Sequence, residues 1–286
     1  PFYVALSILE DSGYLPRAAF LADALMHKLG LHGRAVIPML LGYGCNVPAV
    51  MACRVLETER ERLIAALLVA LMPCAARSVV ILGLVGTYVG LHAALALYLL
   101  SLSLVALLGR AAFKLLPGED LGLVMEIPPY RLPSPRSVLA KSLSRTESFV
   151  RAAFPLIVVG SALLEGLRLA GLLEPLMEAS RPFMEGVLGL PASCTVPLVL
   201  GVLRKELALV MLAEAAGTMD LASVLTARQM VVFAIVLMIY VPCIATIAAL
   251  VKEQGAKRGL LMVGLYVALA ILVGAAANLV LPLVGL

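Results

Sequence analysis

Long apolar runs, separated by short polar connections, dominate the chain. Several of them reach or approach the ~20 residues that a helix needs to cross a bilayer, among them 63–86, 91–108, 230–251 and 259–286. Segments of about ten residues with alternating polarity, the pattern of a transmembrane β-barrel, do not occur in the sequence. The pattern therefore predicts an all-α, polytopic membrane protein.

The two halves of the chain resemble each other at a constant spacing. An ungapped offset of 159 residues, from Gly30 to Gly189, aligns Leu-Gly-Leu at 29–31 with 188–190. The same offset pairs a proline, a Leu-Gly dipeptide and an alanine, at 38 and 197, 41–42 and 200–201, and 49 and 208. A Pro-Cys-x-Ala element follows in each half, at 73–76 and 242–245. We therefore predict two gate repeats, 1–116 (truncated at its N-terminus) and 149–286, joined by a polar loop at 117–148.

Each repeat interrupts its apolar segments with residues that disfavour a helix. Proline removes a backbone donor and clashes with the preceding turn, and glycine reaches backbone angles that a helix does not use. The positions where we expect the chain to unwind at membrane depth are Pro38, Gly42, Gly44, Pro48, Pro73 and Pro242. Unpaired carbonyls in lipid cost several kcal/mol each, so such breaks persist only inside protein or facing water. Broken or re-entrant helices at matching places in two repeats indicate a transport site.

Composition and charge agree with this interpretation and suggest an orientation. Of the 286 residues, 62% are hydrophobic and 14% are charged, with a mean hydropathy of +1.05. The net charge is +4, and the basic residues of the polar segment 110–151 place that segment in the cytoplasm by the positive-inside rule. Phosphate-binding loops, nucleophile elbows and H-E-x-x-H zinc motifs are absent from the sequence, so we expect neither an enzyme nor a nucleic-acid partner.

Polar side chains at the predicted breaks are the candidates for an ion path. We select as metal ligands Cys45, Asn46 and Cys74 in the first repeat and Glu206 and Cys243 in the second. Thiol, amide and backbone carbonyl groups together suit a late first-row divalent ion better than Mg²⁺ or Ca²⁺. The low aromatic content, 5% with no Trp, disfavours a sugar or nucleoside site and leaves that alternative open.

Simpler roles compete with these assignments. The five cysteines form no Cys-x-x-Cys pair, so we expect reduced thiols, with Cys53 and Cys194 serving as packing residues. The Arg-Lys-Glu run at 204–206 fits either a solvated helix end or a pore-facing Glu206 held by a neighbouring base.

Five segments of the chain carry a family resemblance. They are LEDSGYLPRAAF (9–20), GYGCNVPAVMACR (42–54), MPCAAR (72–77), LRKELAL (203–209) and YVPCIATIAALVKE (240–253). In order and spacing they resemble the signature segments of the membrane domain of FeoB-type ferrous iron transporters, including the two gate motifs. The family's cysteines correspond to Cys45, Cys74 and Cys243. Two departures flank Cys74: Pro73 stands where the family has Ser, and Ser-Val at 78–79 where it has Leu-Pro.

The resemblance implies Fe²⁺ uptake across a prokaryotic inner membrane by alternating access. The ion would be cargo rather than a bound cofactor, passed between these cysteines and the unwound carbonyls of 42–47. In the family, a GTP-binding domain and a helical spacer precede the membrane domain, and this sequence contains neither. GTP hydrolysis would therefore come from another region in cis or from a separate chain in trans.

Other partners and alternatives follow from the same resemblance. The lipid bilayer, small cytoplasmic accessory proteins and further copies of the chain are the remaining expected partners. A gate-domain permease for a nucleoside-like or other small solute is the first alternative. A membrane protein that keeps this fold without transport is the second.

Overall fold

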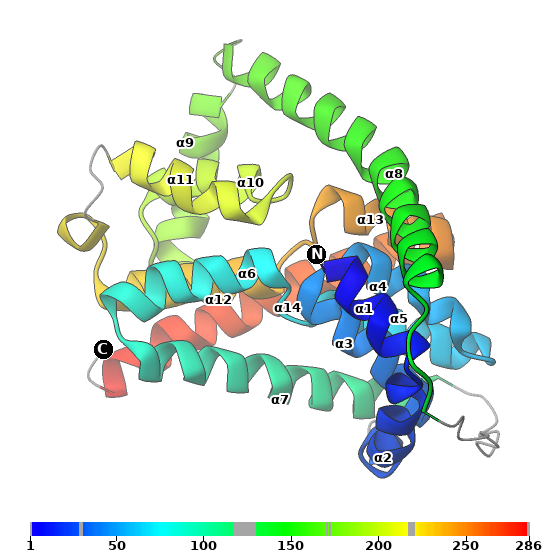
Figure 1. The fold of residues 1–286 in the computed structure, drawn as a ribbon. Helices are drawn as coiled ribbons and strands as arrows, with labels where there is room; N and C mark the ends of the chain where they lie inside the picture. Colours follow the sequence, from blue (N-terminus) through cyan, green and yellow to red (C-terminus); the bar gives the residue numbers. More distant parts are fainter. Residues whose placement is uncertain are drawn as a thin grey trace. The chain divides into compact units, whose positions relative to one another are not determined.

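Helices account for all regular structure in residues 2–28, 31–116, 130–169, 171, 173–216 and 221–284, the part of the chain that this computed structural model describes (Figure 1). Within this part, the helices long and apolar enough to cross a membrane are Glu59–Gly86, Leu91–Leu115, Ala227–Gln254 and Ala256–Val280. A bent pair, Glu178–Leu188 with Ala192–Leu200, has the composition of one more span but turns through 108°. The predicted all-α polytopic membrane fold is confirmed.

Two compact units make up the chain, and each is assembled from separate segments. Unit 1 contains Pro1–Cys74, Leu102–Pro155 and Lys252–Gln254. Unit 2 contains Ala75–Ser101, Leu156–Val251 and Gly255–Leu286. The units cut across the repeats 1–116 and 149–286, whose boundaries stay a prediction.

Unit 1 holds the N-terminal helices. Its elements are α1 (Phe2–Asp11), α2 (Tyr14–Lys28), η1 (Gly33–Ala35), α3 (Val36–Gly44), α4 (Asn46–Ala52), η2 (Cys53–Val55), α5 (Glu59–Leu71), the second part of α7 (Leu91–Leu115) and the first part of α8 (Pro135–Leu169). α3 packs against both α4 and α5. The turn from α1 to α2 uses Gly13 at a φ of 78°, a left-handed angle that favours glycine.

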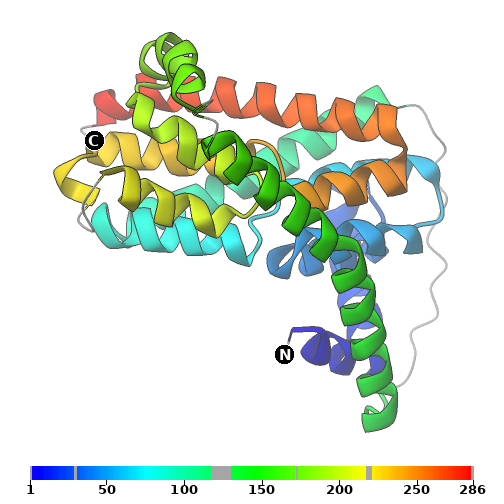
Figure 2. The ribbon, with the colours of Figure 1, turned by 90° about the horizontal axis from the view of Figure 1, so that it is seen from above.

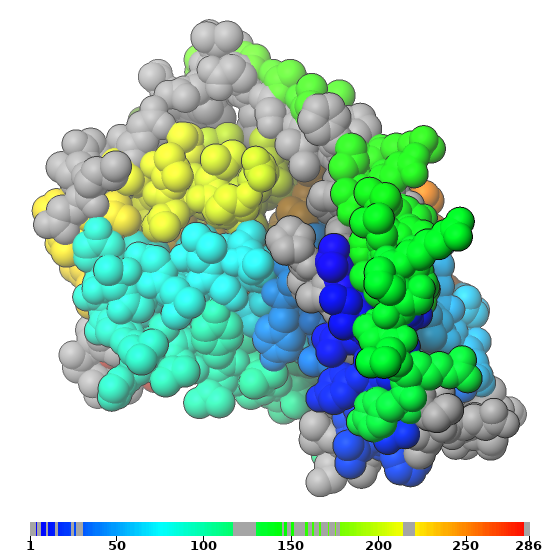
Figure 3. All heavy atoms as spheres, in the orientation of Figure 1, coloured from blue at the N-terminus to red at the C-terminus, as the bar shows by residue number. Residues whose placement is uncertain are grey.

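The start of α8 is held by the end of α1. Asp11 accepts a hydrogen bond from the Ser134 backbone N–H (3.0 Å), and Lys141 Nζ lies 3.4 Å from the same carboxylate. Further along, the Ser142 and Ser7 hydroxyl groups lie 3.2 Å apart. α1 thus lies beside the first part of α8, as the space-filling view shows (Figure 3).

The predicted polar loop at 117–148 is helical in its second part. Residues 117–129 lie outside the described residues, whereas 135–148 are helical because α8 begins at Pro135; the role of 117–148 as the connection between the repeats stays a prediction. A proline at the first helical position is compatible with a helix because the N–H group there has no intrahelical partner. The prolines near this helix therefore mark its start.

Unit 2 contains the second set of helices. Its elements are α6 (Ala75–Val80), the π-helix η3 (Ile81–Gly86), α9 (Leu173–Phe183), the π-helix η4 (Met184–Leu188), η5 (Ala192–Cys194), α10 (Thr195–Leu200), α11 (Lys205–Ala216), η6 (Leu221–Ser223), α12 (Ala227–Ile239), α13 (Ile244–Gln254, to Val251), α14 (Ala256–Val280) and η7 (Leu281–Val284), with the remaining parts of α7 and α8. α12 packs along α14, as both ribbon views show (Figures 1 and 2). α6 lies beside α11 (Figure 3).

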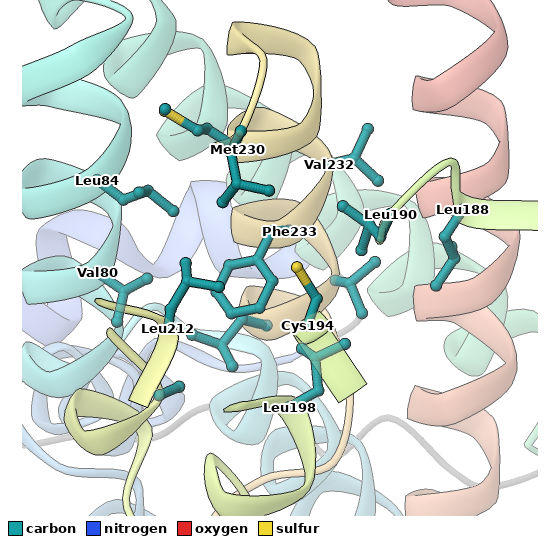
Figure 4. Packing of buried hydrophobic residues seen from close by; sticks show 14 of the residues in the cluster. Val80, Leu84, Leu188, Leu190, Cys194, Leu198, Leu212, Met230, Val232 and Phe233 are labelled. Atoms are coloured by element: carbon teal, nitrogen blue, oxygen red, sulfur yellow. The ribbon is translucent and has the colours of Figure 1, made fainter. Parts of the chain in front are cut away.

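An apolar cluster forms the core of unit 2. Phe233 of α12 is fully buried there, with Leu84 of η3, Leu212 of α11 and Cys194 of η5 around it (Figure 4). Burying a side chain of this size stabilises the fold by roughly 1.5–3 kcal/mol. The cluster therefore holds the short helices α10 and α11 against the long helix α12.

Corresponding helices of the two repeats begin at corresponding residues. At the offset of 159 residues, η1 matches η5, α3 matches α10 and α4 matches α11, each at its first residue. α5 and α12 both have 13 residues and both follow a threonine N-cap, Thr58 or Thr226, whose side chain accepts a backbone hydrogen bond. α7 and α14 both have 25 residues. The helix pattern thus agrees with the internal repeat.

Candidate functional site

The first break of the first repeat is a single residue. α3 ends at Gly44, α4 begins at Asn46, and Cys45 between them is extended, with φ −152° and ψ 128°. The expected unwinding over 42–47 is therefore wrong in extent. Gly42 and Gly44 are helical with negative φ, and Pro48 lies in the first turn of α4. A proline is tolerated there because the first N–H groups of a helix have no intrahelical partner.

Gly42 matters for packing rather than for backbone freedom. A Cβ atom at this position would lie 3.2 Å from Met72 Cβ and 3.5 Å from the Val69 carbonyl oxygen. Glycine therefore lets α3 approach the end of α5. Met72 is the residue at which the second break of this repeat starts.

The second break of the first repeat lies between α5 and α6. α5 ends at Leu71, and the segment Met72-Pro73-Cys74 leads to α6 at Ala75. Pro73 is buried, and Cys74, directly before α6, is partly buried. The helix is thus interrupted at Pro73, and the role of Pro73 in a gate stays a prediction.

Asn46 joins the two breaks of the first repeat. Its side chain is 5% exposed, and its Nδ2 donates to the Ala70 carbonyl oxygen at 3.2 Å. Ala70 lies in the last turn of α5, where carbonyl groups lack intrahelical partners. Because a carbonyl only accepts, this bond fixes the orientation of the amide. The buried Asn46 Oδ1 has no hydrogen-bond partner in the described structure.

Lys205 stands in the second repeat where Asn46 stands in the first. α10 ends at Leu200, and α11 begins at Lys205, at the offset of 159 residues from Asn46. Lys205 is 3% exposed, and its Nζ donates to the Leu237 carbonyl oxygen at 2.7 Å. Leu237 lies in the last turn of α12, the equivalent of α5. Each repeat thus uses the first side chain after its first break to bind a carbonyl beside its second break.

Tyr240 and Gly201 complete the connection in the second repeat. The Tyr240 hydroxyl donates to the Leu198 carbonyl of α10, and the backbone N–H of Ile244 donates to the Val202 carbonyl at 2.9 Å. Lys205 Nζ lies 4.4 Å from the centroid of the Tyr240 ring, a distance that suits a cation–π contact. A Cβ atom on Gly201 would lie 2.9 Å from Tyr240 Oη.

The predicted ligands of the second repeat lie at its two breaks. Cys243 is the N-cap residue of α13, its Sγ is 3.1 Å from Thr246 Oγ1, and the preceding Pro242 is buried. Glu206, in the first turn of α11, pairs with Arg204 at 3.1 Å and has a side chain that is 38% exposed. Among the residues placed by the structure, no three Cys, His, Asp or Glu side chains lie together as a metal site. The five-residue ligand set therefore stays a prediction.

The other two cysteines are packed as small apolar residues. Cys53 is 1% exposed, and its thiol donates to the Ala49 carbonyl at 3.4 Å. Cys194 is fully buried in the apolar cluster of unit 2 (Figure 4). None of the five cysteines forms a disulfide, as the sequence predicted.

Sequence reasoning did not select three residues that the structure makes prominent. Lys205 was one of several polar residues at the predicted breaks and part of a charged run, but it was not selected as a ligand, although the repeat offset pairs it with Asn46. Tyr240 gave no local signal, because its role depends on Leu198, 42 residues away. Arg77 of α6 is 1% exposed, an unusual burial for a cation, and only its place after the Pro-Cys-x-Ala element pointed to it.

Arg54 links the ends of two signature segments. Its Nε and Nη2 atoms donate to both carboxylate oxygens of Glu253, each at 2.5 Å. The Glu253 side chain is 7% exposed, whereas that of Arg54 is 59% exposed. The bidentate pair therefore ties the segment after α4 to the end of α13 within unit 1.

Two family models match the chain. The Gate model, described as nucleoside recognition, matches residues 1–88 and 150–257. The model of the ferrous iron transport protein B C terminus matches residues 94–145, between the two Gate segments.

Curated relatives are similar over much of the chain. The protein named Fe(2+) transporter FeoB of Synechocystis sp. is 33% identical over 281 residues, which cover 88% of this chain and 44% of that protein. Its namesake in Staphylococcus aureus is 32% identical over 269 residues, covering 87% of this chain and 40% of that protein. An Fe(2+) transport protein A/Fe(2+) transporter FeoB fusion protein of Porphyromonas gingivalis is 43% identical over 163 residues, which cover 56% of this chain and 19% of that protein. The chain thus spans less than half the length of these relatives. No solved structure matches it.

Proposed function

This chain belongs to the Gate family and is the membrane domain of an FeoB-type transporter, and from this premise we propose that it carries Fe²⁺ through the broken helices of its two repeats. The relatives that cover most of the chain bear the name Fe(2+) transporter. We place the protein in the inner membrane of a prokaryote, with its GTP-hydrolysing region elsewhere. A small accessory protein is a further proposed partner, supported by the fused relative.

One observation carries the ferrous assignment. α3 ends at Gly44, directly before Cys45, and the residue after Cys45, Asn46, holds a buried amide oxygen without a hydrogen-bond donor. The last carbonyls of a helix and its dipole favour a cation at the C-terminal end. Thiolate, amide oxygen and carbonyl oxygen together suit Fe²⁺ better than Mg²⁺ or Ca²⁺.

The proposed path passes the ion from break to break. Fe²⁺ enters partly dehydrated beside Cys45 and Asn46, because these groups replace some of its water ligands. Cys74 and Cys243, each directly before a helix at a second break, offer further thiol ligands. Alternating access then requires the two breaks of a repeat to separate and rejoin.

Uptake of Fe²⁺ into liposomes tests the proposal. The full-length protein that contains this chain is reconstituted without oxygen and supplied with radioactive Fe²⁺ and GTP. We expect Cys45→Ser or Cys243→Ser to lower uptake at least tenfold, because a hard hydroxyl replaces a soft thiolate. The matched control is Cys194→Ser, in the apolar cluster of unit 2, whose uptake should stay near the wild-type rate. Uptake at the wild-type rate by the Cys45, Cys74 and Cys243 triple Ser variant would refute the ligand role.

A nucleoside-like solute is the second candidate cargo, and the description of the matching Gate model favours it. The same liposomes, supplied with radioactive uridine, separate the two. Uptake of uridine without uptake of Fe²⁺ by the wild-type protein would overturn the ferrous assignment.

A further inference from the structure

The two repeats use the same position for opposite electrostatic purposes. Asn46 and Lys205 are both buried, both begin the helix after the first break, and both donate to a carbonyl in the last turn of the following long helix. An amide that donates through Nδ2 still presents an acceptor oxygen. An ammonium group has three donors, no acceptor and a positive charge. A cation can therefore bind at Asn46, whereas Lys205 repels it.

We propose that Lys205 is a built-in cation that occupies, in the second repeat, the place that the first repeat offers to the transported ion. This inference rests on the proposed transport of Fe²⁺. Lys205 keeps Fe²⁺ away from the Leu237 carbonyl and holds the first break of this repeat closed. Lys205 is thus a positioning residue for the second repeat, and by excluding Fe²⁺ from this repeat it directs the ion to the first one.

The neighbouring contacts explain how one ammonium can hold the breaks together. Lys205 bonds the end of α12 and lies over the ring of Tyr240. The Tyr240 hydroxyl in turn bonds Leu198 of α10. Departure of the ammonium therefore removes both its hydrogen bond to the end of α12 and its contact with the Tyr240 ring. The break can then open only when Lys205 moves, so opening becomes a distinct step that an arriving divalent ion promotes by repulsion.

The repeats are consequently unequal in the transport cycle. The first repeat, with Asn46 Oδ1 and Cys45, takes up the ion. The second repeat, with Lys205 in place, controls its passage. The proposal thus predicts separate effects on ion affinity and on turnover for substitutions at the two equivalent positions.

Binding and uptake of Fe²⁺ by substituted full-length protein test this division. Lys205→Met keeps the length of the side chain and removes the charge, and Lys205→Arg keeps the charge. Lys257→Met, at an exposed position at the start of α14, is the matched control. Oxygen-free equilibrium dialysis with radioactive Fe²⁺ gives the affinity, and liposome uptake gives KM and kcat.

We expect Lys205→Met to bind Fe²⁺ at least fivefold more tightly, with a lower KM and a kcat reduced at least tenfold. Lys205→Arg should restore affinity and KM to within twofold of wild type, and Lys257→Met should change nothing. A purely structural role would lower the melting temperature and kcat and leave affinity and KM unchanged, and that result would overturn the proposal.

A reciprocal substitution keeps the proposal testable if Lys205→Met does not fold. Asn46→Lys places the built-in cation in the first repeat, and we expect Fe²⁺ affinity to fall at least tenfold in folded protein. Unchanged affinity of this variant would overturn the inference while leaving the transport function intact. Failure of the wild-type protein to take up Fe²⁺ would instead refute the transport function itself.

Discussion

Replacing Gly201 with alanine tests whether close approach of the two breaks stabilises the second repeat. The added Cβ atom would lie 2.9 Å from Tyr240 Oη, 3.0 Å from Leu237 Cδ1 and 3.1 Å from the Pro197 carbonyl oxygen. Tyr240 cannot turn away without losing its hydrogen bond to α10. Overpacking of this kind costs about 1–3 kcal/mol, and the lost hydrogen bond about 1 kcal/mol.

The backbone contribution has the opposite sign and is smaller. Gly201 has φ −62° and ψ −14°, which alanine adopts easily, so the substitution recovers about 0.4–1 kcal/mol from the unfolded state. The net expectation is a destabilisation of about 1–3 kcal/mol. Gly264→Ala is the control: this glycine lies inside α14 with nothing within 4 Å of its Cβ position. It should stabilise by about 0.5–1 kcal/mol through helix propensity.

Thermal unfolding in detergent, followed with a thiol-reactive fluorophore, measures the difference. Cys53 and Cys194 are buried and become reactive only on unfolding, so they report the transition. Gly201→Ala should melt several degrees below wild type, and Gly264→Ala at or above it. Equal melting temperatures for the two variants would refute the close-approach argument.

Three further expectations concern bonds within unit 1. Asn46→Leu removes a buried donor and should lower stability by about 1–2 kcal/mol and Fe²⁺ affinity at least tenfold, as measured by thermal unfolding and equilibrium dialysis. Arg54→Met leaves the Glu253 carboxylate without its bidentate partner and should lower the free energy of unfolding by about 1–2 kcal/mol, a value reduced because the arginine is exposed. Replacing both Arg54 and Glu253 with Met should recover most of this lost stability. The Ser134 N–H lowers the pKa of Asp11 below its ordinary 3.8. The ionised carboxylate therefore stabilises the fold above pH 3.8, and this stabilisation is lost as the pH falls through the lowered pKa. The melting temperature of Asp11→Asn, measured between pH 3 and 7, should lack this pH-dependent contribution.

Hydropathy and internal repetition predicted the architecture well. The apolar runs identified the long helices, and the 159-residue offset located equivalent breaks that the structure places at Cys45 and Arg204. These predictions succeeded because the length of an apolar run and an internal repeat can be read directly from the sequence, without knowledge of packing. The conformation at the breaks was less predictable, since Pro48 and Pro135 can begin a helix as well as interrupt one.

The contacts of the candidate site could not be read from local sequence. Asn46 reaches a carbonyl 24 residues away, and Lys205 reaches one 32 residues away. Gly42 was selected for backbone freedom, but its value depends on Met72, a residue of another helix. Such partners become visible only when the helices are packed, which is why the sequence favoured Glu206 over its neighbour Lys205.

The shortness of the half-helices has a consequence for biosynthesis. α10 has six residues and α3 has nine, so at 1.5 Å per residue they extend about 9 and 14 Å, far less than the ~30 Å hydrocarbon core. A translocation channel that releases helices into lipid according to their length and apolarity has little reason to release these segments one at a time. The ammonium of Lys205 finds its carbonyl only after Leu237 has been synthesised, 32 residues later. The hydrogen bond that buries Lys205 therefore forms only after α12 has been synthesised, which makes the packing of this short segment a late step of assembly.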